Sequence, residues 1–506
     1  MMQPVFLTPF LLVSGVLAAG CSSSPVVVQN QGVELARATS VGINPSQIEL
    51  ASNPSPKDVE QDKQDEVQPE ETKQFIVDLC SASFAKRQAA IYELNQRLTA
   101  GGLRQQLKHL LVDPNCWSFA LDAMEKQGDL DDDTLSDALV RTAGDMNLAD
   151  RQKTRHVEKR FDPYFERLLR KVRRKGDPGP GLGKLVNRLK NLVKSGDKGP
   201  AVVIFVKVVE HAEKEIARHP EIINQLGVPV AEAIQEGIFD DEETSLKFLD
   251  LVERHASQHV QAAVYTHIAS GIREGTMANE RVAKALLDNV EQADRAIIDR
   301  VVTPLAETLK KKGVVFSNAL AQRSVRLFGR AEETRRNHAL RLAAQGVESG
   351  ILDNTVTIAG MRGVADAFGR TSWDAVAPYF ARRIGATGRL GDDVNAQEAL
   401  RSIGRVASLN IREQTVRDVA PTIANGVNGI AVHADTALRL VELMDSAGVA
   451  GLDTGAPHIA TGIANGNVND VAVAQEFFRI VVRATNPNDV ADNLKDAIAL
   501  GPAGGL

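Results

Sequence analysis

Two stretches near the C-terminus share one pattern, Pro421-Thr-Ile-Ala-Asn-Gly426-Val427 and Pro457-His-Ile-Ala-Thr-Gly462-Ile463. A third copy, Thr266-His-Ile-Ala-Ser-Gly271-Ile272, lies well upstream, and weaker copies fall before and between these three. The last glycine of the pattern, or its equivalent, stands at positions 237, 271, 308, 346, 383, 426 and 462, which are 34, 37, 38, 37, 43 and 36 residues apart. A recurrence of this length is typical of stacked helical repeats.

A second apolar segment with helical spacing follows each copy of the pattern. In Arg281–Ala293 the residues Val282, Leu286 and Val290 are four apart, and Thr436–Met444 has the same character. Two helices per repeat indicate an α-solenoid, in which each repeat packs only on its neighbours. We interpret the recurring glycine as a point of close approach by the next helix, because glycine otherwise costs a helix up to ~1 kcal/mol.

The repeat length and the paired helices resemble HEAT or armadillo repeats from about residue 231 to the end. The regular Asp and Arg of typical HEAT units are missing, so the resemblance is to the class and to no narrower family. We therefore predict an all-α fold, with a HEAT/armadillo-like solenoid over residues 199–506 preceded by a smaller helical region over residues 73–198.

The region 73–198 predicts several short helices. A loop of glycine, proline and aspartate at 176–181 interrupts them. The predicted helices are Lys86–Leu98, Leu103–Leu111, Trp117–Lys126, Asp133–Gly144 and Phe165–Arg174.

The N-terminus carries a candidate export signal. Residues 1–20 contain no charged side chain, and Val5–Leu17 is mostly apolar but too short to span a bilayer. It runs into Leu17-Ala-Ala-Gly-Cys21-Ser22, which resembles the bacterial lipobox. The resemblance implies that residues 1–20 are a lipoprotein signal peptide, that Cys21 is lipidated, and that its acyl chains anchor the chain to a membrane. Because Ser22 stands where aspartate would retain a lipoprotein at the inner membrane, it also implies the outer membrane, facing the periplasm.

Residues 21–72 are rich in Ser, Pro, Gln and Asn and then become acidic. Such a composition buries too little apolar surface to offset chain entropy, so we expect a disordered, lipid-anchored linker.

Two cysteines remain after Cys21, namely Cys80 and Cys116. An oxidising compartment favours a disulfide between them. The alternative is a pair of buried free thiols.

Residues 151–198 form a basic segment. It holds sixteen Lys or Arg against five acids, a net +11, so that with −6 overall the rest of the chain carries −17. Behind a lipobox we expect an anionic lipid or an acidic protein rather than nucleic acid as its partner. The alternative is a solvated helix face whose charges pair within the chain. The candidate binding patch is Arg167, Arg170, Lys171, Arg173, Arg174 and Lys175.

No motif for catalysis, cofactor or metal binding is complete. The glycines before Lys184 lack the order of a phosphate loop, and the acids Asp129–Asp133 lack the later glycine and glutamate of a calcium loop. His255 and His259 lack the glutamate of a zinc protease, and aromatic residues make up only 4% of the chain. We predict no enzyme, no cofactor and no metal site.

These features predict a non-enzymatic scaffold that binds one or more proteins of the cell envelope. The alternative is a structural protein that links the membrane to peptidoglycan or anionic lipid through residues 151–198. An enzyme built on a helical ring is the least favoured hypothesis, because no motif supports it.

The lipobox predicts the fate of a Cys21→Ala variant. Without the cysteine thiol no acyl chain can be attached, so the precursor should stay uncleaved and take up no clickable palmitate analogue. Labelling of this variant at the wild-type level would contradict lipidation at Cys21.

Overall fold

The computed structural model describes residues 70–97, 107–113, 116–128, 130–144, 146, 151–175, 180–196, 198–216, 220–312, 317–488, 490–492 and 495. Within these ranges the side chains of residues 70–73, 95, 97, 112, 151–156, 170–175 and 180–183 are not described. Residues 68–506 form one compact unit, and the statements below concern that unit alone. Cys21, the predicted signal peptide and nearly all of the predicted linker lie outside the described residues.

All regular elements described in the first part of the unit are helices. Helix α5 packs on α6, α7 and α8, so these four helices form one local bundle. The elements are α1 (Glu70–Leu79), α2 (Phe84–Arg97), the 3₁₀ helix η1 (Lys108–Val112), α4 (Trp117–Gln127), α5 (Asp132–Gly144), α6 (Arg151–Lys175), α7 (Pro180–Lys194) and α8 (Gly199–Ile216). The helices predicted at Trp117–Lys126 and Asp133–Gly144 match α4 and α5 to within one residue.

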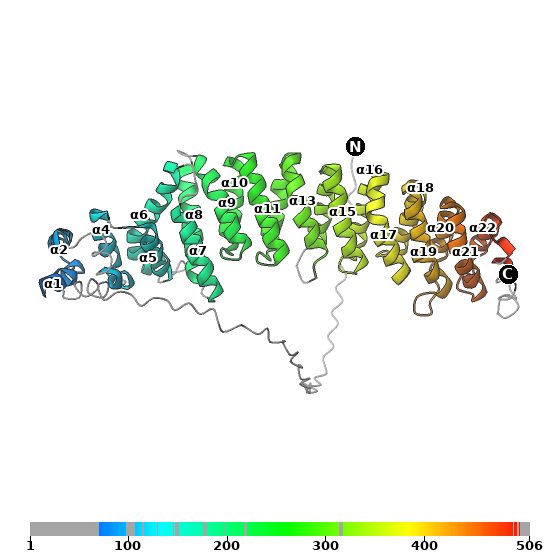
Figure 1. The fold of residues 1–506 in the computed structure, drawn as a ribbon, viewed down its shortest axis with the longest axis horizontal. Helices are drawn as coiled ribbons and strands as arrows, with labels where there is room; N and C mark the ends of the chain where they lie inside the picture. The colour runs from blue at the N-terminus through cyan, green and yellow to red at the C-terminus, as the bar shows by residue number, and fades with distance from the viewer. Residues whose placement is uncertain are drawn as a thin grey trace, which may run out of the picture. The chain divides into compact units, whose positions relative to one another are not determined.

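The rest of the unit is a regular array of helix pairs (Figure 1). Its helices are α9 (Glu221–Gln235), α10 (Glu242–His255), α11 (Gln258–Glu274), α12 (Glu280–Gln292), α13 (Arg295–Leu309), α14 (Asn318–Arg330), α15 (Glu333–Glu348), α16 (Thr355–Phe368), α17 (Arg370–Thr387), α18 (Asp393–Val406), α19 (Leu409–Asn425), α20 (Ala434–Ser446), α21 (Gly448–Ala464) and α22 (Val471–Val481).

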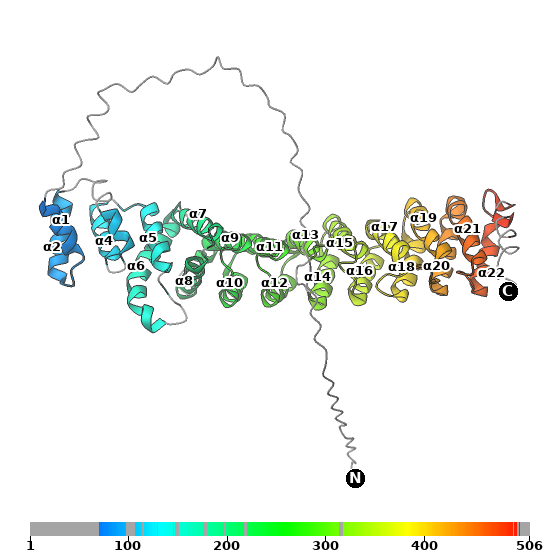
Figure 2. The same cartoon turned by 90° about the horizontal axis from the view of Figure 1, so that it is seen from below.

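These helices form two rows. From α9 onward each odd-numbered helix packs on the next odd-numbered one, and each even-numbered helix on the next even-numbered one (Figure 2). The described residues contain no strand, only two isolated bridges in turns. The predicted all-α solenoid is therefore confirmed. None of the described helices is both long and apolar enough to cross a membrane.

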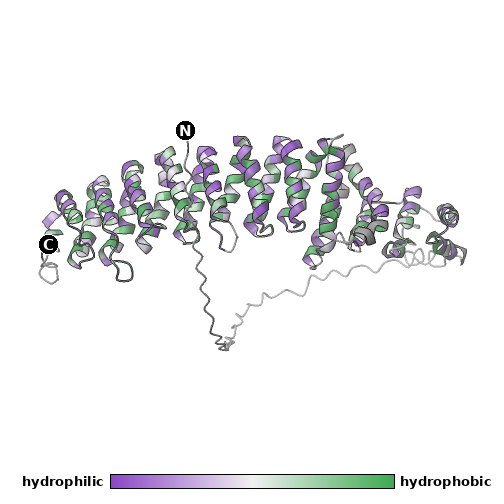
Figure 3. Ribbon diagram, turned by 180° about the vertical axis from the view of Figure 1, so that it is seen from behind, coloured by the Kyte–Doolittle hydropathy of each residue, from purple (hydrophilic) through white to green (hydrophobic). Residues whose placement is uncertain are grey.

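Each helix has a polar and an apolar side, as the alternating colours of Figure 3 show. The apolar sides meet between the rows, where one cluster of buried side chains runs from Ile76 to Val490. In a solenoid this core is long and thin, so the stability of each repeat comes from its own helices and from the two neighbouring repeats.

The even-numbered helices begin at a constant interval. Each is preceded by a residue whose side chain accepts a hydrogen bond from a backbone N–H of the first turn, and this cap supplies an acceptor that the helix lacks. The caps are 38, 38, 37, 38, 41 and 37 residues apart, at Asp241, Asn279, Ser317, Asn354, Asp392, His433 and Asp470.

A longer period of about 75 residues is superimposed on the helix pairs. Asn224 in α9 and Asp299 in α13 accept hydrogen bonds from the backbone N–H groups of Ser257 and Glu332, over 2.7 and 2.6 Å. Asp374 in α17 and Asp453 in α21 bond Ser408 and Thr485 in the same way, over 2.9 and 2.8 Å. The same four helices carry an internal proline four or five residues later, at 229, 304, 378 and 457. The array is therefore built from four-helix units, α9–α12, α13–α16, α17–α20 and a last one that begins at α21.

Three of the recurring glycines lie where odd-numbered helices come into backbone contact. A Cβ on Gly271 would be 3.1 Å from the Cα of Gln235, one on Gly346 would be 2.7 Å from the carbonyl oxygen of Leu309, and one on Gly462 would be 3.2 Å from the Cα of Ala424. These distances leave no room for a side chain, in agreement with the close approach expected from the sequence.

The same interpretation is wrong for Gly426 and Gly237. Both lie after the end of their helices with positive φ angles of 68° and 71°, so they end a helix rather than pack against one. The pattern around Gly426 and Gly462 is alike in sequence, yet α19 stops at Asn425 while α21 continues through Gly462.

The backbone contact at Gly346 predicts a large difference between two alanine variants. Gly346→Ala should cost about 1–3 kcal/mol, because its methyl group would push α15 away from α13. Gly363→Ala in α16 is the control. Nothing lies within 4 Å of a Cβ at Gly363, so alanine should be neutral or stabilise the helix by up to ~1 kcal/mol. Urea unfolding followed by circular dichroism measures both, and equal effects would contradict the close contact.

Candidate functional site

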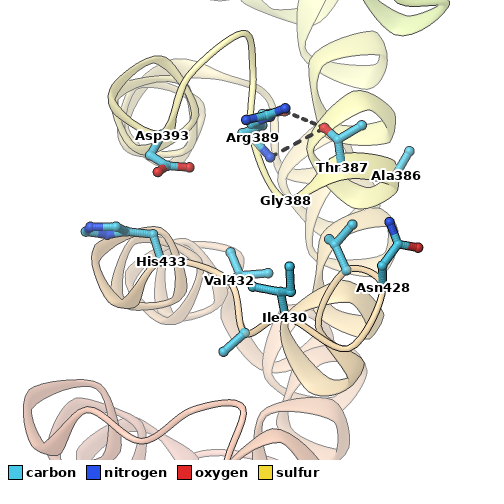
Figure 4. A pocket seen from close by; sticks show the side chains of 11 residues that line it. Ala386, Thr387, Gly388, Arg389, Asp393, Asn428, Ile430, Val432 and His433 are labelled. Atoms are coloured by element: carbon cyan, nitrogen blue, oxygen red, sulfur yellow. Dashed lines mark hydrogen bonds between the residues drawn. The ribbon is translucent and has the colours of Figure 1, made fainter.

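A groove of about 570 Å³ lies between two successive turns of the third four-helix unit. One wall is the turn between α17 and α18, and the other is the turn between α19 and α20 (Figure 4). Clefts of this size are typical of binding sites, and this one is lined about equally by polar and apolar groups.

A glycine at the end of α17 makes the apolar floor possible. Gly388 has a φ angle of 72° and ends the helix in the left-handed conformation. A Cβ on this residue would be 3.2 Å from the nearest methyl carbon of Val427 and 3.3 Å from that of Val432. The missing side chain therefore lets both valines reach the wall opposite them.

The second wall contains a tight two-residue turn. The N–H of Val427 donates to the carbonyl of Ile430 over 2.8 Å, and the N–H of Ile430 donates back over 3.0 Å. Between them Asn428 and Gly429 have φ angles of 52° and 78°. Two consecutive positive φ angles are the mark of a hairpin turn, and asparagine followed by glycine is the sequence that tolerates them best. The turn holds Ile430 with 72% of its surface exposed.

The polar groups of the groove come mainly from the first wall. The hydroxyl of Thr387 donates to the carbonyl of Arg389 over 2.8 Å, which braces the turn. The guanidinium of Arg389 and the carboxylate of Asp393 both line the groove. Neither forms a hydrogen bond or ion pair with any residue that the structure describes.

His433 both caps α20 and lines the groove. Its Nδ1 accepts from the N–H of Asp435 over 3.3 Å and lies 3.4 Å from the amide nitrogen of Gln397. An accepting Nδ1 leaves the proton of a neutral imidazole on Nε2, which is then a donor. In Figure 4 the ring faces Asp393 across the mouth of the groove. Among the seven caps of the even-numbered helices, His433 is the one that is not Asp, Asn or Ser.

The described part of the basic segment pairs largely within the chain. Of its basic side chains that the structure describes, Arg167 pairs with Glu125 and Arg188 with Asp137. Lys184 lies 2.6 Å from Asp133, Lys190 lies 2.7 Å from Glu236, and Lys198 lies 3.4 Å from Asp240.

Arg167 is thus the one member of the predicted patch that the structure places. The side chains of the other five members, Arg170, Lys171, Arg173, Arg174 and Lys175, lie outside the described residues. The acids at Asp133 and Asp137, which the sequence showed near a calcium-like run, act as partners for these cations.

A buried ion cluster attaches the basic helix α6 to α8. The ammonium of Lys207 lies 3.0 Å from Glu158 and 3.1 Å from Asp162, and 8% of its side chain is exposed. Burial lowers the pKa of Lys207, but the hydrogen bonds and charges of the two carboxylates outweigh burial and raise the pKa above its usual value. The cluster therefore serves to hold the two helices together.

The disulfide expected from the sequence is present in the structure. Cys80, which follows α1, is bonded to Cys116, the residue before α4, and their Cα atoms are 5.0 Å apart. Within the described ranges no three His, Cys, Asp or Glu side chains are grouped so that they could hold a metal ion.

No known family model matches the chain, and no curated protein matches it either. The functional interpretation therefore depends on the geometry of the array and of the groove.

The unusual cap predicts that His433→Asp stabilises the array by about 0.5–1 kcal/mol, since a carboxylate accepts from the first-turn N–H groups and favours the positive end of the helix dipole. The reciprocal variant Asp392→His, in the preceding repeat, should cost a similar amount. Urea unfolding midpoints of the two variants give the comparison. If His433→Asp lowers stability, histidine is retained for capping and not for the groove.

Proposed function

We propose that this protein is a membrane-anchored lipoprotein that acts as a non-enzymatic α-solenoid scaffold. In this proposal the C-terminal half of the array holds another protein of the cell envelope. The observation that carries it is the distribution of large apolar side chains that face water.

Exposed apolar side chains are confined to two parts of the described chain. Val77, Phe84 and Tyr92 belong to α1 and α2, and no other large hydrophobic residue described before residue 351 is exposed. From residue 351 on there are ten: Ile351, Val356, Phe368, Val394, Leu409, Ile430, Val449, Val471, Phe478 and Val482. Apolar residues that gather on one part of a surface favour a protein interface, because water contact otherwise gives them no advantage.

Equivalent positions at the helix starts differ between α10 and α12, in the first half of the array, and α16 and α18, farther along. The second residue after the cap is Glu243 in α10 and Arg281 in α12, but it is Val356 in α16 and Val394 in α18. The two valines are 57% and 64% exposed. Valine is a weaker helix former than arginine or glutamate, so folding alone does not favour it at a solvated helix start.

The anchor is proposed from the lipobox at Cys21. Acyl chains on that residue would place the array at the outer membrane, facing the periplasm. The linker of about 50 residues has an r.m.s. span of roughly 40 Å if it is flexible. The array would then reach partners that are not themselves in the membrane.

The alternative function through the basic segment receives less support. Five of the eight basic side chains described between residues 151 and 198 pair with acids of the same chain. This pairing reduces the charge that an external anionic surface can meet. We therefore do not propose a link to peptidoglycan or to anionic lipid.

Site-specific photocrosslinking in intact cell envelopes tests the scaffold. A photoreactive residue at Val394 should capture a defined protein, whereas the same residue at the equivalent and equally exposed Arg281 should not. Capture of muropeptides instead, or equal capture from both positions, would contradict a protein scaffold that uses the C-terminal half.

A further inference from the structure

A comparison of equivalent turns distinguishes the groove between residues 386–393 and 426–433 from the rest of the array. The turn between α19 and α20 has eight residues, whereas the equivalent turns after α11 and α15 have five and six. The added residues form the hairpin turn that carries Ile430. The same turn ends in the histidine cap. The turn between α13 and α14 is equally long, but among the described turns of the array this one alone has two consecutive positive φ angles and a histidine cap, and it lines a cavity.

The floor of the groove requires an apolar occupant. Val427, Ile430 and Val432 line it from one wall, and Ile430 is the most exposed large hydrophobic residue that the structure describes. Burying an aliphatic side chain against these three would remove apolar surface from water on both partners. A purely polar ligand would cover Ile430 without burying apolar surface of its own, so it would gain less.

The charge of the groove requires a carboxylate beside the apolar group. The guanidinium of Arg389 lines the cavity without an acidic partner among the described residues. Its planar fork fits a carboxylate with two parallel hydrogen bonds. Asp393 on the same wall repels a second carboxylate, so the acidic group of the occupant has one favourable position, at Arg389.

The shape of the cavity favours an occupant that is an extended chain passing through it. The cavity is open to solvent and lies between two turns (Figure 4). Its volume of about 570 Å³ lies within the range of 300–1,000 Å³ typical of ligand sites, and this suits a few residues of extended peptide. His433 lines the same cavity on the side of Asp393.

We propose that this groove binds an extended internal segment of a partner protein, in which an aliphatic side chain packs on Val427, Ile430 and Val432 and a neighbouring Asp or Glu pairs with Arg389. The proposal deepens the scaffold function and rests on it. It assigns the chemistry that the partner must present at one place on the array.

Selection from a library of displayed random heptapeptides tests this assignment on the full mature chain. The wild-type protein should enrich peptides with an aliphatic residue next to an acidic one. Arg389→Glu should lose that preference and enrich a basic residue in its place. Arg341→Glu is the matched control, because Arg341 is an exposed arginine of α15 with no ion pair among described residues, and it should select the wild-type peptides.

Affinity is then measured by fluorescence anisotropy with one selected heptapeptide, acetylated and amidated at its ends. A charge-assisted pair is worth about 1.5–3 kcal/mol, so Arg389→Glu should weaken binding about ten- to hundredfold. Ile430→Ser should also weaken it, and circular dichroism confirms that both variants fold.

Three results would overturn the proposal. They are no enrichment by the wild-type protein, the same peptides selected by Arg389→Glu, and binding only of peptides with a free C-terminal carboxylate. Crosslinking at Val394 that persists after any of these results would leave the scaffold intact and remove only the groove chemistry.

Discussion

Backbone contact between successive odd-numbered helices is the constraint on which the rest of the array depends. Gly271, Gly346 and Gly462 allow it, since a side chain at any of them would meet the backbone of the preceding odd-numbered helix. Because the odd-numbered helices stack at this close distance, the turns that follow them come at nearly equal intervals along the chain. Each even-numbered helix therefore starts from a cap at a position equivalent to that of the preceding cap. The groove lies between two such turns, one of which contains the hairpin turn at Asn428-Gly429.

The repeats of the array can be compared with one another at equivalent positions, because each packs in the same way with different residues. Six caps of the even-numbered helices are Asp, Asn or Ser, which accept well at a helix start, and one is His433. Solvated helix starts carry charged residues at α10 and α12 but valine at α16 and α18. Such departures do not help the array to fold, and they gather in the half of the array that exposes apolar side chains. This is the pattern expected where a surface is selected for binding rather than for stability.

The sequence alone predicted the all-α fold and the solenoid of paired helices, because apolar spacing and repeat length are local signals. In the first region it predicted only the end of α6, at Phe165–Arg174, and no helix at α7. The four-helix unit is not apparent from the Pro-x-Ile-Ala-x-Gly pattern, because its mark is an asparagine or aspartate four or five residues before a proline. That pattern was visible at Asn224, Asp299, Asp374 and Asp453. The pairing of Lys184 and Arg188 with Asp133 and Asp137 was not visible, because their partners are about 50 residues away and meet only after α5 and α7 pack. The groove was missed for the same reason, although Asn428-Gly429 is a strong turn signal.

Each repeat packs only on its neighbours, so that the proposed binding half is a surface built from independent units. Removal of residues 448–506, which deletes α21 and α22, tests this most directly when the truncated chain is followed by hydrogen exchange of its backbone amides. Stacked repeats predict that amides in α9 to α17 keep their protection, while those of α19 and α20 lose part of theirs because their packing partners are gone. Loss of protection throughout the chain would show a single long-range core and would contradict the account.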